Sequence, residues 1–300
     1  MPKHKPNLPE GAPLTTAAVK QHYTRPPSFT DLLPWMEYIP ESRAFLLEDG
    51  VSLGALFEVQ PVGCEARTPA FMTQLRDAIQ TAINEAIPER DDAPWVLQIY
   101  VQDEPRLTQF NESLARYPSP AVRASHYSQH YQSVMSKHLQ AISRPGGLFD
   151  DTTVTGSRWQ GQQRRIRVVL YRRLKSNGKM PPAVEVEEAL NDVATKWIAS
   201  LTSAGINAQR ASGQAFYQWL LNWFNPNPPL ADGNPESLMQ VAPYPGDDNL
   251  PFGYDFAEQL TLSMPRSDEA TSSWIFDKLP HTVVTVQSLR RAPDIGHFTA

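Results

Sequence analysis

The sequence predicts an α+β fold in which a mixed, partly antiparallel sheet is covered by helices, with an N-terminal β-hairpin. Short β-rich runs alternate along the chain with segments whose apolar residues recur every three or four positions. An Asp-Gly pair at Asp49 and Gly50 separates two β-rich runs, 44–47 and 51–59, which is the pattern of a tight hairpin. Both signals together favour a sheet with helices packed on it.

The elements expected next begin with a helix. Thr68 suits the cap position and Pro69 the first helical position, where the missing N–H costs nothing. Its apolar face consists of Phe71, Leu75, Ile79, Ile83 and Ile87. A strand at 95–101 follows, then a short helix near 107–114 and a longer helix at 120–142.

The second half is expected to alternate in the same way. It should contain a strand at 164–174, a helix from 181 to Gly205, a short strand at 206–209 and a helix capped by Ser212. Residues 225–251 are rich in Pro, Asn, Asp and Gly and predict a long loop with little regular structure. Closing strands are expected at 259–264, 273–276 and 282–289. We therefore divide the chain into a leader (1–28) and two α/β subdomains (29–150 and 151–300).

Composition limits the class of protein. The 300 residues carry a net charge of -5, with 41% hydrophobic and 20% charged residues, as in folded globular proteins. The single cysteine, Cys64, allows neither a disulfide framework nor a cysteine zinc site. No apolar run approaches the roughly 20 residues of a membrane-spanning helix. These features predict a cytoplasmic protein.

The sequence shows no recognisable catalytic, metal or cofactor constellation. A phosphate-binding loop needs a glycine-rich turn before Lys and Ser or Thr, but Gly178-Lys179 is followed by Met180. His126 and His130 have a metal-compatible spacing without an evident third ligand, so a surface pair is favoured. We expect no ATP site, cofactor or metal within this chain.

One basic segment, Arg158–Lys179, stands out because it contains no acidic residue. On a strand, alternate side chains share a face, so arginines and a tyrosine should lie opposite an apolar face. The candidate contact residues are Arg165, Arg167, Tyr171, Arg173 and Lys175. This face suits single-stranded nucleic acid, but a solvated edge strand or a surface for a protein partner is favoured over that interpretation.

Aromatic residues gather near the second half of the chain. Trp197, Phe216, Trp219, Trp223 and Phe224 lie at helical spacings, which is typical of core packing. Trp219, Trp223 and Phe224 also precede the Pro-rich segment directly. A docking site at this end of the helix is the alternative interpretation.

Three segments carry a family resemblance: 29–35 (FTDLLPW), 45–50 (FLLEDG) and 54–58 (GALFE), with Tyr38 as a matching tyrosine. They resemble the opening of TraC-type conjugative-transfer ATPases, motors of type IV secretion systems, in the branch encoded by integrating conjugative elements. The Pro-rich loop and 282–286 (TVVTV) follow in the same order. The resemblance covers most of the chain from about Phe29.

The resemblance implies more than the residues show. Members form hexamers on the cytoplasmic face of the inner membrane, bind ATP and Mg²⁺ in a carboxy-terminal motor domain, and power pilus assembly and substrate transfer. We expect that motor domain downstream of Ala300, so that this chain is a non-catalytic docking and scaffold region. Its expected partners are inner-membrane channel components, its own motor domain and neighbouring subunits.

Two other hypotheses remain at this point. A single-stranded nucleic-acid module would use Arg158–Lys179 and would bind DNA in a salt-dependent manner. A free-standing enzyme would need a pocket with convergent carboxylates such as Glu185, Glu187 and Glu188, which otherwise suit the acidic first turn of a helix.

Overall fold

The computed structural model describes residues 29–64, 66–89, 93–104, 107–144, 146, 159–174, 181–246, 256–282 and 284. At its centre is a six-stranded sheet in the order β1-β2-β3-β5-β4, with β6 paired to β3. The strands are β1 (Trp35–Ile39), β2 (Ala44–Leu47), β3 (Leu53–Gln60), β4 (Trp95–Glu104), β5 (Gln163–Arg172) and β6 (Asn207–Arg210). These strands pair antiparallel, and together with the helices they confirm the α+β class and the N-terminal hairpin.

The predicted Asp-Gly hairpin is the junction of β2 and β3, where Phe45 faces Gly54. Asp49 ties the turn by accepting hydrogen bonds from the backbone N–H groups of Val51 (3.0 Å) and Ser52 (2.7 Å). Gly50 has a φ of 71°, a left-handed conformation that glycine adopts without steric cost. The sequence analysis missed β1, which lies between two prolines and pairs with β2.

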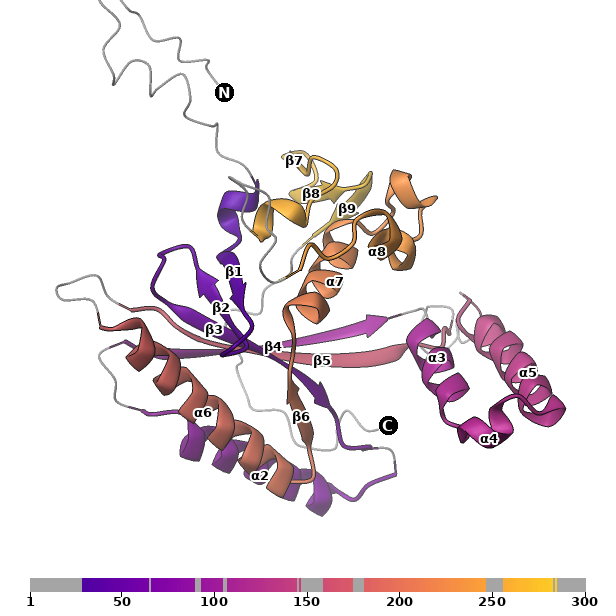
Figure 1. Ribbon diagram of the computed structural model, residues 1–300, viewed down its shortest axis with the longest axis horizontal. Coiled ribbons are helices and arrows are strands. Elements are labelled where there is room, and N and C mark those ends of the chain that lie inside the picture. The colour runs from indigo at the N-terminus through magenta and orange to yellow at the C-terminus, as the bar shows by residue number, and fades with distance from the viewer. Residues whose placement is uncertain are drawn as a thin grey trace, which may run out of the picture.

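One face of the sheet is covered by α2 (Pro69–Ala86) and α6 (Ala183–Ser203), which lie side by side (Figure 1). The Oγ atom of Thr68 accepts from the N–H of Phe71, as the capping signal predicted. Side chains of both helices pack against the strands in one buried core. They are Ala82, Ala86, Leu190, Val193, Trp197 and Leu201. Each buried Leu or Val contributes roughly 1.5–3 kcal/mol, so this layer holds the sheet in place.

The other face of the sheet carries α7 (Gly213–Phe224) and the C-terminal part of the described chain. That part contains η2 (Pro229–Ala231), η3 (Pro235–Ser237), α8 (Leu238–Val241), η4 (Ala257–Gln259) and a three-stranded sheet of β7 (Arg266–Asp268), β8 (Ser273–Phe276) and β9 (Leu279–His281). The core on this side is aromatic: Phe216 contacts Phe45 at 4.4 Å and Phe256 at 5.7 Å between ring centroids. The sheet is therefore buried on both faces near its centre.

A helical lobe lies between β4 and β5 in the chain, and these two strands pair to form a long ribbon. The lobe consists of α3 (Thr108–Arg116), α4 (Pro120–Arg123) and α5 (His126–Ile142), and it lies at the far end of the ribbon (Figure 1). Of the side chains described in these helices, that of Leu139 is buried, whereas Tyr127 of α5 is 87% exposed. Tyr117, which follows α3, is 88% exposed. The lobe thus has little core of its own.

The structure corrects several sequence-based expectations in the helices and loops. The predicted helix at 120–142 is split into α4 and α5, because the Oγ atom of Ser125 accepts from the N–H of Ser128 and starts a new helix. Residues 225–246 contain three short helices, η2, η3 and α8, where a long loop with little regular structure was expected.

The strand predicted at 259–264 is wrong. The buried Asn225 side chain binds this segment, accepting from the N–H of Leu262 (3.1 Å) and donating to the carbonyl of Leu260 (2.8 Å). A side chain thereby takes backbone groups that a strand would pair with another strand. The strand at 273–276 is confirmed as β8. The strand predicted at 282–289 lies largely outside the described residues, as do the leader (1–28) and residues 247–251 of the Pro-rich segment.

Strands from both halves of the chain share the central sheet. β5, from beyond residue 150, lies between β3 and β4. β6 pairs with the C-terminal half of β3, from Phe57 to Gln60. The division into subdomains at residue 150 stays a prediction.

Candidate functional site

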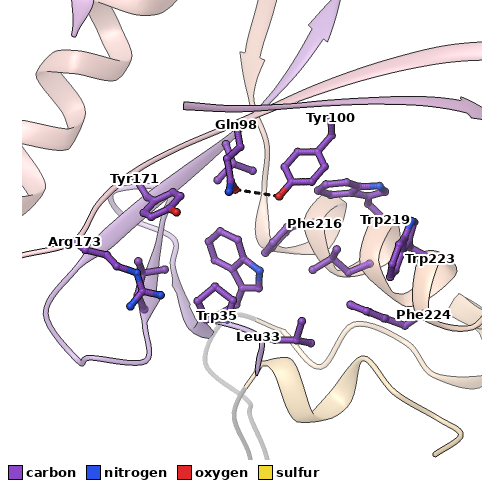
Figure 2. A pocket seen from close by; sticks show the side chains of 14 residues that line it. Leu33, Trp35, Gln98, Tyr100, Tyr171, Arg173, Phe216, Trp219, Trp223 and Phe224 are labelled. Atoms are coloured by element: carbon purple, nitrogen blue, oxygen red, sulfur yellow. Dashed lines mark hydrogen bonds between the residues drawn. The ribbon is translucent and has the colours of Figure 1, made fainter. Parts of the chain in front are cut away.

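An open pocket lies between the sheet and α7, on the face opposite α2 and α6. Its volume is about 350 Å³, and half of its lining residues are aromatic. Its lining residues are Leu33, Pro34, Trp35, Leu47, Gln98, Tyr100, Val169, Tyr171, Arg173, Phe216, Trp219, Leu220, Trp223 and Phe224. Figure 2 shows Tyr171 and Arg173 on one side, Trp219 and Trp223 on the other, and Trp35 between them. We call this the aromatic pocket.

Contacts with two buried aromatic rings hold the Trp35 ring in place in the pocket. The Trp35 ring meets Phe216 at 4.9 Å with an interplanar angle of 87°, and Phe45 at 5.9 Å. Edge-to-face contacts of this kind are favourable beyond the area they bury. Gly54 lies closely against the pocket wall, since a Cβ atom there would lie 3.2 Å from the Cβ of Tyr171 and 3.4 Å from the Trp35 ring.

The opposite wall is the side of α7 that carries Trp219 and Trp223. Ser212 starts this helix, since its Oγ accepts from the N–H of Ala215, as predicted. The indole N–H of Trp219 donates to Oε1 of Gln102 at 2.9 Å, which fixes the ring against β4. Trp223 packs against Phe224 at 4.9 Å, yet it remains 43% exposed. One wall therefore combines a fixed ring with one that solvent reaches.

Tyr100 closes the pocket from β4. Its ring meets Trp219 edge to face at 5.4 Å, and its hydroxyl donates to Oε1 of Gln98 at 3.0 Å. Burial raises the pKa of Tyr100, with a further contribution from Tyr171, so its hydroxyl stays protonated at neutral pH. The hydroxyl is therefore a hydrogen-bond donor within an otherwise apolar wall.

The rim of the pocket carries an ion pair. Nη1 of Arg173 lies 2.6 Å from Oε1 of Glu48, and both side chains are about half exposed, at 50% and 41%. The hydrogen bond to Glu48 is the main cause that raises the pKa of Arg173. The pocket thus presents a polar edge beside its aromatic interior.

The predicted basic face has a different environment from the one expected. Arg167 is buried rather than exposed, so the expectation for that side chain is wrong: its guanidinium group lies 3.5 Å from Glu104 and 4.0 Å from Glu58. Burial lowers the pKa of Arg167, and the two carboxylates oppose this shift. Arg165 lies 3.3 Å from Glu104. Carboxylates distant in sequence therefore lie close to both of these arginines.

The structure brings together only part of the candidate contact set. Tyr171 and Arg173 line the aromatic pocket, Arg167 lies behind Trp219, and Arg165 lies toward the end of the ribbon near Glu104. Lys175 lies outside the described residues, as do Arg158 and Lys179. Whether these residues contact a partner or nucleic acid stays a prediction.

Core packing holds for three of the five aromatic residues singled out from the sequence. Trp197, Phe216 and Phe224 are buried, whereas Trp219 is half-buried and Trp223 is exposed. The other wall residues, Trp35, Gln98 and Tyr100, were missed. The run of β-favouring residues between Pro34 and Pro40 could have indicated a strand that carries Trp35. No local pattern indicated that Gln98 and Tyr100 line a pocket.

The part of the chain that the structure describes gives little support for a metal site, a membrane-spanning helix or a carboxylate site. No group of three or more potential metal ligands occurs there, and the rings of His126 and His130 lie parallel on α5. No helix described in this structure combines the length and apolar character needed to cross a bilayer. Of the three carboxylates expected in the first turn of a helix, Glu185 lies in the first turn of α6, whereas Glu187 and Glu188 lie further along the helix.

Comparison with known proteins gives one result. A model of the TraC protein family matches residues 29–300, which is nearly the whole chain. Neither the curated proteins nor the solved structures yielded a match. The match begins at Phe29, the first residue of η1, and includes every element that lines the aromatic pocket. The chain therefore belongs to the TraC protein family and has a role related to conjugative transfer.

Proposed function

We propose that this chain is a docking and scaffold region of the conjugative-transfer machinery, and that a protein partner binds in its aromatic pocket. The observation that carries the proposal is the set of partly exposed rings of Trp35, Tyr100, Tyr171, Trp219 and Trp223 around one open cavity. Tryptophan and tyrosine dominate the binding energy of protein interfaces because they bury a large area and still offer a polar atom.

The support beneath the rings favours binding by a preformed surface. Trp219 is held by Gln102 and by the guanidinium group of Arg167, and Trp35 by Phe216. Rings that are already ordered lose little conformational entropy when a partner binds. The Arg173–Glu48 pair at the rim supplies polar groups that can fix the orientation of the partner.

We further propose that the partner is an inner-membrane component of the secretion channel, and that this region lies at the cytoplasmic face of that membrane. In this proposal, ATP hydrolysis in a motor domain shifts the contacts of this region with the channel. Pilus assembly and transfer of DNA or protein would be coupled to hydrolysis in this way. Family membership and the pocket support the proposal; the partner itself is inferred.

A protein partner is favoured here over single-stranded nucleic acid. The arginines that the nucleic-acid hypothesis needs are close to carboxylates: Arg164 to Asp103 at 2.9 Å, Arg173 to Glu48 at 2.6 Å, and Arg167 to Glu104 at 3.5 Å. A phosphate backbone would have to displace these carboxylates. By contrast, the rings of the aromatic pocket are partly exposed among the described residues, so a partner side chain can reach them without displacing a carboxylate.

The test is site-specific photocrosslinking in donor cells, with a photoreactive phenylalanine analogue at Trp223 and, as matched control, at Tyr127. Tyr127 is an exposed aromatic residue on the helical lobe, away from the pocket. We expect an adduct with an inner-membrane channel component from position 223 and none from position 127. Mating assays should show that Trp223→Ala lowers transfer frequency about tenfold or more, while Trp223→Phe and Tyr127→Ala preserve it.

Two results would reject the proposal. One is normal transfer by a folded Trp223→Ala, Trp219→Ala double variant without any crosslink at position 223. The other is binding of single-stranded DNA that falls steeply with salt and is lost in Arg164→Gln, Arg173→Gln but retained in Trp223→Ala. The second result would replace protein docking by the nucleic-acid alternative.

A further inference from the structure

A second cavity, here called the polar pocket, lies where the turn between β1 and β2 meets α6 and the end of β6. Its volume is about 490 Å³. Its lining residues are Glu41, Ser42, Arg43, Asn191, Ala194, Thr195, Ile198, Gln209 and Arg210. It shares none of them with the aromatic pocket, so it is a separate site.

Two arginines converge on this pocket from different elements. Arg43 comes from the turn and is exposed, whereas Arg210 ends β6 and is largely covered by its neighbours. Among the ion pairs of the described residues, none includes Arg43 or Arg210. Burial is the main cause that lowers the pKa of Arg210, and the charge of Arg43 adds to it, whereas Tyr38 and the carboxylate of Glu187 act in the opposite direction. The two cations are thus near each other, and neither has a carboxylate within ion-pair distance among the described residues.

Buried hydrogen-bond donors without partners gather at the same place. Nη1 of Arg210 donates to Oδ1 of Asn191 at 2.6 Å, but its Nε and Nη2 are buried and have no partner among the described residues. The hydroxyl of Ser42 is in the same state, in a residue that is only 5% exposed. Buried polar atoms in folded proteins are nearly always hydrogen-bonded, and exceptions call for an ion, a water or a ligand.

We propose that the polar pocket binds a phosphate group between the guanidinium groups of Arg43 and Arg210, with the Ser42 hydroxyl as a further donor. Guanidinium groups match the spacing of phosphate oxygens and bind them with two parallel hydrogen bonds. A phosphate has enough acceptor oxygens for all of these donors at once. Glu41 is the single carboxylate in the described lining, so the two arginines outnumber it.

The proposal includes a local rearrangement. Because Nε and Nη2 of Arg210 are shielded from solvent, its guanidinium group has to turn toward the cavity and loosen its bond to Asn191. Arg43 needs no such change, since its side chain is already exposed beside the pocket. The phosphate can come from two sources, free phosphate in solution or the headgroup of a phospholipid, and the chemistry of recognition is the same.

The experiment measures binding of inorganic phosphate to the full 300-residue chain by calorimetry and by thermal unfolding, with ionic strength held constant by sodium chloride. We expect phosphate to bind and to raise the melting temperature, because a ligand that binds only the folded state stabilises it. Chloride and acetate at the same ionic strength should leave the melting temperature unchanged.

Three variants test the assignment of residues. Arg43 has a φ of 49°, so Arg43→Asn removes the cation with a residue that tolerates this left-handed backbone. It should weaken phosphate binding about tenfold or more, because a hydrogen bond to a charged group is lost. Arg210→Gln should do the same. Arg76→Gln, at an exposed arginine of α2, is the control and should bind phosphate as the parent chain does.

Ser42→Ala gives the sharpest result. The hydroxyl has no partner among the described residues, so its removal should leave the melting temperature without phosphate unchanged or raise it. The phosphate-dependent rise should nevertheless shrink. A purely structural serine would show the opposite order of effects, with a loss of stability in the free chain and no change in phosphate binding.

Vesicles of phosphatidylcholine with and without phosphatidic acid separate the two sources. If the chain floats with the phosphatidic acid vesicles and Arg43→Asn abolishes this flotation, the site binds a lipid headgroup. If the chain binds phosphate but does not float with the vesicles, the site binds free phosphate. The proposal is overturned if phosphate binds no better than acetate, or if Arg43→Asn and Arg76→Gln bind phosphate equally well.

Discussion

The guanidinium group of Arg167 stacks on the indole ring of Trp219, with its central carbon 4.7 Å from the ring centroid. Gln102 links the same two side chains, since its Oε1 accepts from Trp219 at 2.9 Å and from Arg167 at 3.4 Å. The basic strand and the aromatic pocket are therefore one structure: the arginine orders a ring that the pocket presents. A cation over an indole face contributes about 0.5–2 kcal/mol, and more when water is excluded.

Replacement of Arg167 by methionine, which keeps most of the volume, should destabilise the chain by about 1–3 kcal/mol. The cause is the loss of hydrogen bonds to a charged group and of the contact with Trp219. Urea unfolding followed by tryptophan fluorescence measures the change. Arg164→Met is the control, because its pair with Asp103 is exposed and should contribute less than about 1 kcal/mol. Equal losses in both variants would contradict the role of burial.

Local signals in the sequence located several elements correctly. The Asp49-Gly50 turn, the Thr68 cap and the Ser212 cap each depend on residues within a few positions of one another. The burial of Arg167 could not be predicted in this way, because its partners Glu58 and Glu104 reach it only through the pairing of β5 with β3 and β4. The alternation of basic and apolar side chains predicted two different faces for β5. It did not predict that α7 covers the face that carries Arg167.

The same limit applies to the pocket. Trp219 and Trp223 were noted from helical spacing, yet Tyr100 joins them only because the β4 edge of the sheet lies beside α7. The strand predicted at 259–264 failed for the same physical reason, since Asn225, far away in sequence, binds the backbone of that segment. Side chains that act across the fold leave no local pattern.

Replacement of Gly213 by alanine should destabilise the start of α7. A Cβ atom there would lie 2.7 Å from the ring of Tyr38 and would also meet the Tyr244 hydroxyl. Overpacking of this kind costs about 1–3 kcal/mol. Thermal unfolding measures it, with Gly50→Asn as control, because nothing lies within 4 Å of a Cβ at position 50 and asparagine tolerates a positive φ. A Gly213→Ala variant as stable as the parent would disprove the close packing.

Asn225 should be one of the most sensitive polar positions. Its buried amide donates to the carbonyls of Leu221 and Leu260, each at 2.8 Å, and accepts from Leu262 at 3.1 Å. Asn225→Ala removes the side-chain partner of the Leu260 carbonyl and of the Leu262 N–H, and each orphaned group costs about 1–3 kcal/mol. The Leu221 carbonyl keeps the backbone N–H of residue 225 as its donor. Chemical denaturation should show a loss of that size or greater. Asn207→Ala, at an exposed position of β6, should stay within about 0.5 kcal/mol of the parent.

Asp49 should make the hairpin sensitive to acid. Burial on its own raises the pKa of this carboxyl, but hydrogen bonds donated by the Ser52 hydroxyl and by the N–H groups of Ser52 and Val51 outweigh it, so the pKa is lowered. A lowered pKa means that stability is present above the ordinary value near 4 and is lost as the pH falls through the folded value. Melting curves between about pH 2 and pH 6 should show a smaller decline in Asp49→Asn than in the parent.

The helical lobe should open before the rest of the fold. α5 has 17 residues and buries only Leu139, whereas α6 has 21 residues and buries Leu190, Val193, Ala194, Trp197 and Leu201. Local opening is easiest where few apolar side chains are buried. Hydrogen exchange read by mass spectrometry under native conditions should therefore show faster exchange in α5 than in α6. Leu139→Ala should speed exchange throughout α5 and leave α6 unaffected, because that leucine is the one buried anchor described in the lobe. Equal protection of both helices would mean that the lobe is held by contacts other than its own core.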